Sequence, residues 1–167
     1  MSISPIEPTE RTINPLDTVE QVVASRSWPF DRVGDDELTI VVAGTWCDYH
    51  LSFTWCDDLE ALQLACAFDM KVPAPKRREV HSLLALANER LWIGHFDLWS
   101  DDQVLLYRHG LLLQGGATPN ADQCETLIQL AVEACERFYP AFQFVVWGGK
   151  NAEEAVAASM FDCVGEA

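Results

Sequence analysis

Three side chains in the second half of the chain could carry out general acid–base chemistry. His95 and Asp97 are two residues apart, so they share one face if this segment is a strand, and His109 lies at the end of the next predicted strand. An imidazole beside a carboxylate can act as a general base. The sequence contains neither G-x-S-x-G nor H-E-x-x-H, so no nucleophile or metalloprotease motif accompanies these residues. A surface hydrogen-bonding pair is the favoured interpretation, and a small hydrolase-like enzyme that uses the three residues is the alternative.

The stretch WCDYHLSFTWC could instead bind a metal ion, because it brings Cys47, His50 and Cys56 together in the sequence. On a strand, Cys47 and His50 point to opposite faces. His50 and Cys56 share a face but are roughly 20 Å apart at ~3.3 Å per residue. The C-x-x-C spacing that is common in zinc sites does not occur in this sequence. We therefore expect a structural strand here, with no metal site and no cofactor.

Gly148–Asn151 reads GGKN and resembles the end of a phosphate-binding loop. The complete motif is G-x-x-x-x-G-K-[ST], which requires Gly at position 144 and Ser or Thr at position 151. The sequence has Phe144 and Asn151, so both ends of the motif fail. A glycine cap at the end of a helix is the better interpretation.

Composition restricts the kind of partner. The chain has 167 residues, of which 49% are hydrophobic, enough for one domain with its own core. Its formal net charge is −15, with only 11 Lys and Arg residues, which disfavours nucleic acids and anionic membranes. Such a domain suits a basic or amphipathic protein partner.

The N-terminal residues lack the basic and apolar regions of a secretory signal, and no apolar run approaches the ~18 residues of a membrane span. We therefore expect a cytoplasmic protein whose six cysteines stay reduced.

The elements that would position these side chains follow from hydrophobic periodicity. Residues 1–13 are polar and are interpreted as a flexible leader, and residues 14–167 as a single domain. Asn14-Pro15 predicts a helix start, and Pro29 ends that helix near Trp28. We then expect strands at 37–44, 47–55 and 61–69, a helix over 72–92, and a hairpin of strands 94–99 and 103–113 that pairs Phe96 with Tyr107 and Leu98 with Leu105.

The C-terminal third is predicted to be helical. Thr118-Pro119 opens the longest helix, which Pro140 kinks or restarts. Residues 141–147 fit either a helix or a strand, and a helix is favoured. Gly148-Gly149 ends it, and Asn151 with Glu154 caps a final short helix.

The strands have one apolar and one small or polar face. In 47–55 the apolar side chains are Tyr49, Leu51, Phe53 and Trp55, with Cys47 on the same face. This pattern predicts an α+β fold in which helices pack on one face of an antiparallel sheet of about five strands.

Two surface features could bind partners. Trp99, Val104 and Leu106 fall on the sheet face that the helices do not cover, and this apolar group is a candidate homodimer interface. The cluster of Lys71, Lys76, Arg77 and Arg78 could dock an acidic partner, although a solvated surface is the favoured interpretation.

Six segments resemble the YbjN-domain family: RSWPF, HLSFTW, LACAFDMKVP, LANERLWIGHFDLW, RHGLLLQGG and FYPAFQFVVWGGK. The resemblance spans about residues 16–158. It implies a bacterial sensory-transduction regulator whose fold is similar to class I type III secretion chaperones, in the order α-β-β-β-α-β-β-α. Those chaperones are acidic, homodimeric and non-enzymatic, and each binds a segment of a client protein. The resemblance therefore implies a chaperone-like or regulatory protein-binding domain, with no catalytic residues to carry over.

Overall fold

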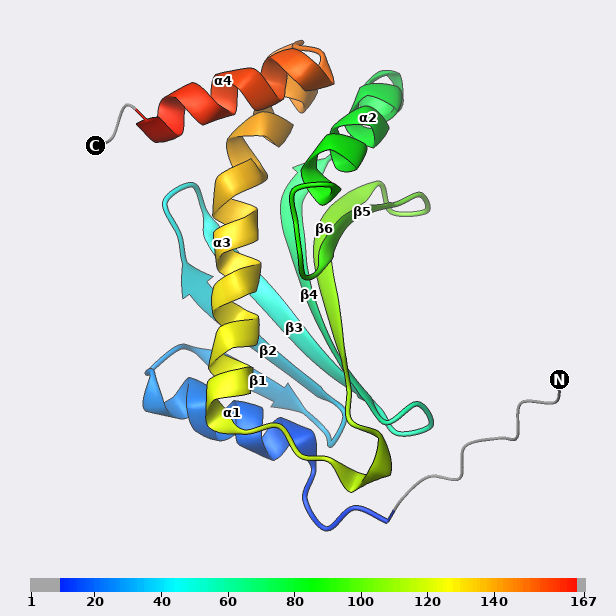
Figure 1. Ribbon diagram of the computed structural model, residues 1–167, viewed down its shortest axis with the longest axis vertical. Coiled ribbons are helices and arrows are strands. Elements are labelled where there is room, and N and C mark those ends of the chain that lie inside the picture. Colours follow the sequence, from blue (N-terminus) through cyan, green and yellow to red (C-terminus); the bar gives the residue numbers. More distant parts are fainter. Residues whose placement is uncertain (1–9, 165–167) are drawn as a thin grey trace, which may run out of the picture.

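The computed structural model describes residues 10–164 of the chain, with side chains described as far as residue 160. The described residues form four α-helices and six strands (Figure 1). The helices are α1 (Pro15–Ser25), α2 (Arg77–Asn88), α3 (Ala121–Val146) and α4 (Ala152–Val164). The strands are β1 (Phe30–Val33), β2 (Glu37–Ala43), β3 (Asp48–Cys56), β4 (Ala61–Lys71), β5 (His95–Trp99) and β6 (Val104–Leu112). Two short 3-10 helices, η1 (Ala74–Lys76) and η2 (Gln114–Gly116), precede α2 and α3.

The strands form one antiparallel sheet in the order β1-β2-β3-β4-β6-β5. The α+β class is confirmed, as are the predicted pairs Phe96 with Tyr107 and Leu98 with Leu105. The sheet has six strands where about five were predicted, because β1 was not recognised. β1 has four residues and three of them are exposed, so it lacks the apolar alternation that marks the other strands.

Helices cover one face of the sheet. In Figure 1 α3 runs lengthwise in front of the strands, with α1 across one end and α2 and α4 near the other. The predicted alternation of β3 is confirmed: Tyr49, Leu51, Phe53 and Trp55 are buried against these helices, while the residues between them are exposed or half-buried. Cys47 lies just before β3 and is half-buried against the same core.

The helix ends follow the polar residues that the sequence places there. The Asn14 side chain accepts a hydrogen bond from the Leu16 N–H at 2.9 Å. The predicted capping box of α4 is confirmed, since the Glu154 N–H donates to the Asn151 side chain at 2.9 Å and the Asn151 N–H donates back to Glu154 at 3.2 Å.

The longest helix, α3, continues through Pro140, and residues 141–146 are helical as favoured. Gly149 lies beyond its C-terminus with φ +68°, the left-handed conformation typical of a helix-ending glycine. Within the described residues, none of the helices has both the length and the apolarity that crossing a bilayer requires.

Candidate functional site

The three residues of the enzymatic alternative do not converge. His95 lies opposite Arg108 in the β5–β6 ladder, so His95, Asp97 and Arg108 share the open face of the sheet. Arg108 and Asp97 approach within 3.9 Å there. His109 follows Arg108 on β6 and therefore points to the opposite, helix-covered face. The three side chains therefore lie on two different faces of the sheet.

The residues considered for metal binding are also separated. His50 and Cys56 are exposed on the open face of β3, and Cys47 packs against the core on the other side. Among the residues that the structure describes, no group of three or more His, Cys, Asp or Glu side chains is arranged to hold a metal ion.

The three residues of the candidate homodimer interface lie on the open face of the sheet. Trp99 is directly opposite Val104, and Leu106 lies between Ala67 of β4 and Asp97 of β5. Trp99 is 46% exposed, whereas Leu106 is only 2% exposed although it is not part of the helix-covered core. Trp99 therefore provides most of the accessible apolar surface of this group.

The four basic residues surround the start of α2. Lys71 ends β4, Lys76 ends η1, and Arg77 and Arg78 form the first turn of α2. Lys71 and Arg78 are exposed, and the other two are half-buried. No acidic partner pairs with any of the four within the described part of the chain, at ion-pair distance.

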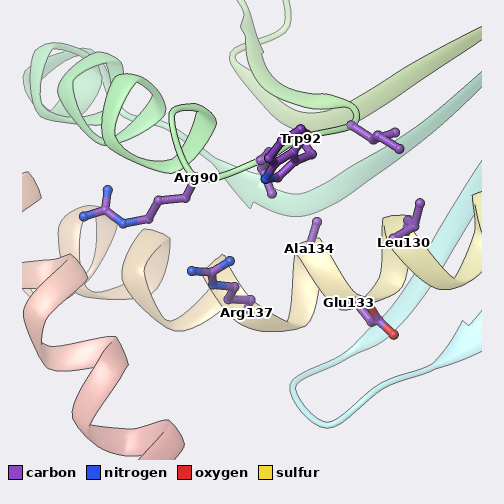
Figure 2. A pocket seen from close by; sticks show the side chains of 8 residues that line it. Arg90, Trp92, Leu130, Glu133, Ala134 and Arg137 are labelled. Atoms are coloured by element: carbon purple, nitrogen blue, oxygen red, sulfur yellow. The ribbon is translucent and has the colours of Figure 1, made fainter.

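A concave surface lies elsewhere, between α3 and the loop that joins α2 to β5. One hollow, of about 260 Å³, lies between loop residues 90–93 and the middle of α3. Figure 2 shows Trp92 and Ala134 on its two sides, with Arg90 and Arg137 toward one end. A second hollow, of about 300 Å³, lies between β6 and the first half of α3.

The two hollows share the lining residues Ile93 and Leu130, so they adjoin each other, and together we call them the α3 groove. Most of its lining is apolar. Its lining includes Trp92, Ile93, His109, Leu111, Leu127 and Leu130.

Trp92 is the most exposed large apolar side chain of the described residues, at 101% of its reference area. Ile93 beside it is also exposed. Leaving an indole entirely in water forgoes the burial of one of the largest apolar side chains, and exposed apolar clusters of this kind mark binding surfaces.

The loop that carries Trp92 is fixed at its ends. The Asn88 side chain accepts a hydrogen bond from the Phe96 N–H at 2.7 Å and donates to the Phe96 carbonyl at 3.0 Å. The Tyr107 hydroxyl donates to the Ile93 carbonyl at 3.1 Å. Gly94 has φ +71°, and a Cβ there would lie 2.0 Å from the Tyr107 hydroxyl oxygen, so only glycine fits. Trp92 is thus presented by an ordered loop.

His109 is the histidine in the wall of the second hollow. Its Nδ1 is buried and has no hydrogen-bond partner among the described residues. Burial lowers the pKa of His109 below 6.5, and the nearby His95 lowers it further. The imidazole therefore contributes a neutral, partly apolar wall at neutral pH.

Sequence reasoning placed Trp92 at the end of a helix predicted over residues 72–92 and missed its role. α2 ends at Asn88, and Glu89–Gly94 form the loop. The available signal was the Trp92-Ile93-Gly94 sequence, in which two large apolar residues precede a glycine turn and lie outside the apolar stripe of α2.

Comparison with known proteins identifies the family of this α+β domain. The profile of the YbjN family, described as "Putative bacterial sensory transduction regulator", matches residues 15–144. The chain therefore belongs to the YbjN family. No curated protein matches the sequence significantly.

Two solved structures share the fold. One is YbjN from E. coli, described as a putative transcription regulator, with 12% identity and a TM-score of 0.53 over 72% of this chain and 85% of that one. The other is the ExsC–ExsE complex, with 12% identity and a TM-score of 0.54 over 73% of this chain and 88% of the matched chain. At this identity the similarity establishes the fold and not the function.

Proposed function

We propose that this protein is a non-enzymatic, chaperone-like or regulatory domain that binds a segment of a partner protein in the α3 groove. The observation that carries the proposal is Trp92, a fully exposed indole held by an ordered loop beside an apolar depression. Tryptophan is enriched among the residues that dominate binding energy at protein interfaces. A pre-ordered loop also lowers the entropy cost of binding.

The comparisons support this class of function. The family is described in terms of regulation, and one protein with the same fold forms a complex with another protein, ExsE. The placement of His109 on the opposite sheet face from His95 and Asp97 favours binding over the hydrolase-like alternative.

The charge of the chain indicates the partner's character. At a net charge of −15 the protein repels nucleic acids and anionic membranes, so the proposed partner is a basic or amphipathic protein segment. A cytoplasmic location, where free cysteines persist, is part of the proposal.

Peptide binding tests the function. A phage-displayed library of random 12-residue peptides is selected on the immobilised protein, and the affinities of the enriched peptides are measured by calorimetry. Trp92→Ala should weaken binding at least about tenfold, which corresponds to about 1.4 kcal/mol. Trp147→Ala is the matched control, because Trp147 is also exposed but lies at the end of α3, outside the groove. Equal affinities for the two variants would reject the groove as the binding site.

A homodimer is the second part of the proposal. Trp99 and Val104 form an apolar surface on the open face of the sheet, and a two-fold axis would bury two copies of it together. The net charge opposes association, so salt should strengthen it by screening.

Light scattering at micromolar concentration tests the dimer. The wild type should have twice the mass of one chain, and Trp99→Glu should reduce this to one chain mass. Gln63→Glu adds the same charge to the same face at an exposed position and should leave the dimer intact. A wild-type mass equal to that of a single chain would rule the dimer out.

A further inference from the structure

We infer that the partner segment binds as an extended strand that adds to the edge of β6 at Gly110–Leu112, beside the second hollow of the α3 groove. This inference rests on the proposed function and specifies how the segment is held. It follows from the different lengths of two paired strands.

β6 is longer than the strand that covers its outer edge. β4 pairs with β6 as far as Leu112, but β5 pairs with it only from Val104 to Arg108. Among residues 10–164, residues 109–112 of β6 therefore have a neighbouring strand on one side only. At ~3.3 Å per residue this uncovered edge is roughly 13 Å long, enough for about four residues of an added strand.

The backbone groups that face this edge can be identified. Because the Asn88 side chain binds both the N–H and the C=O of Phe96, the backbone of Phe96 faces away from β6. In an antiparallel ladder the direction alternates, so His95 faces β6 and bonds its partner Arg108. Two and four residues further along β6, Gly110 and Leu112 face the same side as Arg108.

An independent hydrogen bond supports this assignment. Leu113 directly follows β6, and its N–H donates to the Glu60 carbonyl at 2.8 Å, so the backbone of Leu113 faces β4. Because the direction alternates, the backbone of Leu112 faces the outer side. Within the described part of the chain, the N–H and C=O of Gly110 and Leu112 have no backbone partner on the outer side.

The edge is also accessible. Leu112 is 70% exposed, and a Cβ placed on Gly110 would have no atom within 4 Å. An unpaired strand edge in water is a template for strand addition, since main-chain hydrogen bonds provide affinity and alternate side chains provide specificity.

The geometry also sets the pattern of the added segment. Its residue opposite Leu111 would point to the helix-covered side, into the hollow formed with Leu127 and Leu130. Residues opposite Gly110 and Leu112 would point to the open face of the sheet. The segment should therefore carry apolar residues at every second position, on the side that faces the second hollow.

Charge adds a further requirement. Asp122 lies on the rim of the second hollow, and the chain as a whole is strongly acidic. Arg90 and Arg137 lie in the first hollow, beyond Trp92. The residues of the segment next to Asp122 should therefore be neutral or basic, and an acidic residue would fit only toward Arg90 and Arg137.

Proline at position 112 tests the inference. Leu112→Pro removes the outward N–H and leaves the hydrogen bonds to β4 in place, a substitution that an edge position tolerates. Leu112→Ala keeps the N–H and is the matched control. Binding of the phage-selected 12-residue peptides should weaken at least about tenfold in the proline variant and change less than about threefold in the alanine variant.

A second pair of variants tests the hollow. Thr126 is exposed on its wall, so Thr126→Trp should fill it and block binding. Gln129→Trp places the same side chain on an exposed position of α3 outside the hollow, and binding should persist.

Hydrogen exchange of the wild type gives a direct readout that requires no variant to fold. Bound peptide should slow exchange at the Gly110 and Leu112 amides. If Trp92→Ala abolishes binding while these amides stay unprotected and Leu112→Pro binds normally, strand addition is overturned and the proposed function stands. If the peptides bind Trp92→Ala and Leu112→Pro with wild-type affinity, or if the selection enriches no peptide, both the strand addition and the proposed function are overturned. A proline variant with half the wild-type mass would show that a second copy occupies the edge, which also overturns the inference.

Discussion

The indole N–H of Trp46 donates a hydrogen bond to the main-chain carbonyl of Glu136 at 3.2 Å. In a regular helix this carbonyl would accept from the N–H of residue 140, but that residue is proline and has no N–H. The Glu136 side chain accepts from the Thr45 N–H at 2.9 Å in the same loop. The β2–β3 loop thus satisfies the group that Pro140 leaves free, which helps explain why α3 continues through Pro140.

This relationship predicts a coupling between Trp46 and Pro140. Trp46→Phe should cost about 0.5–1.5 kcal/mol of unfolding free energy, because the Glu136 carbonyl loses its donor. In a Pro140→Ala background the helix supplies its own N–H, so the same change should cost less. Chemical denaturation of the four proteins measures the difference. An identical cost in both backgrounds would show that the indole hydrogen bond does not compensate for the N–H that Pro140 lacks.

A second prediction concerns the ion pair between Arg11 and Glu60, whose side chains are both buried and 3.0 Å apart. Arg11 also lies over the Trp55 ring and donates to the Leu113 carbonyl at the end of β6. Arg11→Ala would leave the Glu60 carboxylate buried without its partner and should cost about 3–5 kcal/mol.

The control is Arg26→Ala, which breaks the more exposed pair with Glu125 and should cost less than about 1 kcal/mol in the same denaturation experiment. Similar losses of unfolding free energy for both variants would show that burial does not increase the contribution of the Arg11–Glu60 pair to stability.

The third prediction concerns the core. Phe53 is fully buried on β3, between Leu38 and Leu64 in the sheet register. Phe53→Ala should reduce the unfolding free energy by about 3–5 kcal/mol, since it leaves a cavity. A loss well below 1 kcal/mol on urea denaturation would contradict the packing described here.

The fourth prediction concerns pH. Burial holds the pKa of His109 below 6.5 in the folded protein, while the unfolded chain has the ordinary value. Above pH 6.5 the group is neutral in both states and stability does not depend on it. As the pH falls below 6.5, the unfolded state takes up the proton first, so folding stability decreases.

NMR titration of the imidazole should give a midpoint below 6.5, and His109→Gln should reduce the loss of stability between pH 7.5 and 5. A midpoint above 6.5 would contradict the burial of this side chain.

Much of the fold was predictable because its strands alternate and its helices carry polar caps. Phe53 and its neighbours identify the buried face of β3, and Asn14 and Asn151 identify helix starts. The strand β1 was missed because its short, exposed sequence is held by pairing with β2, a non-local interaction that periodicity does not report.

The binding surface was harder to predict. The sequence assigned Leu106 to the open face of the sheet but could not reveal that neighbouring side chains already bury it. Leu127 and Leu130 belong to the apolar side of α3 whether or not a groove lies beside them. The groove exists because the loop at Trp92 stands away from α3, and only the three-dimensional arrangement reports that distance.

The most direct test of the proposed binding function is ¹⁹F NMR of the protein labelled with 5-fluorotryptophan, titrated with a phage-selected 12-residue peptide. Trp92→Phe and Trp147→Phe assign the two resonances. The proposal predicts that the Trp92 resonance shifts as the peptide binds, because the indole leaves water, while the Trp147 resonance stays in place. Saturating binding that leaves the Trp92 resonance unchanged would contradict the proposal that this protein holds its partner in the α3 groove.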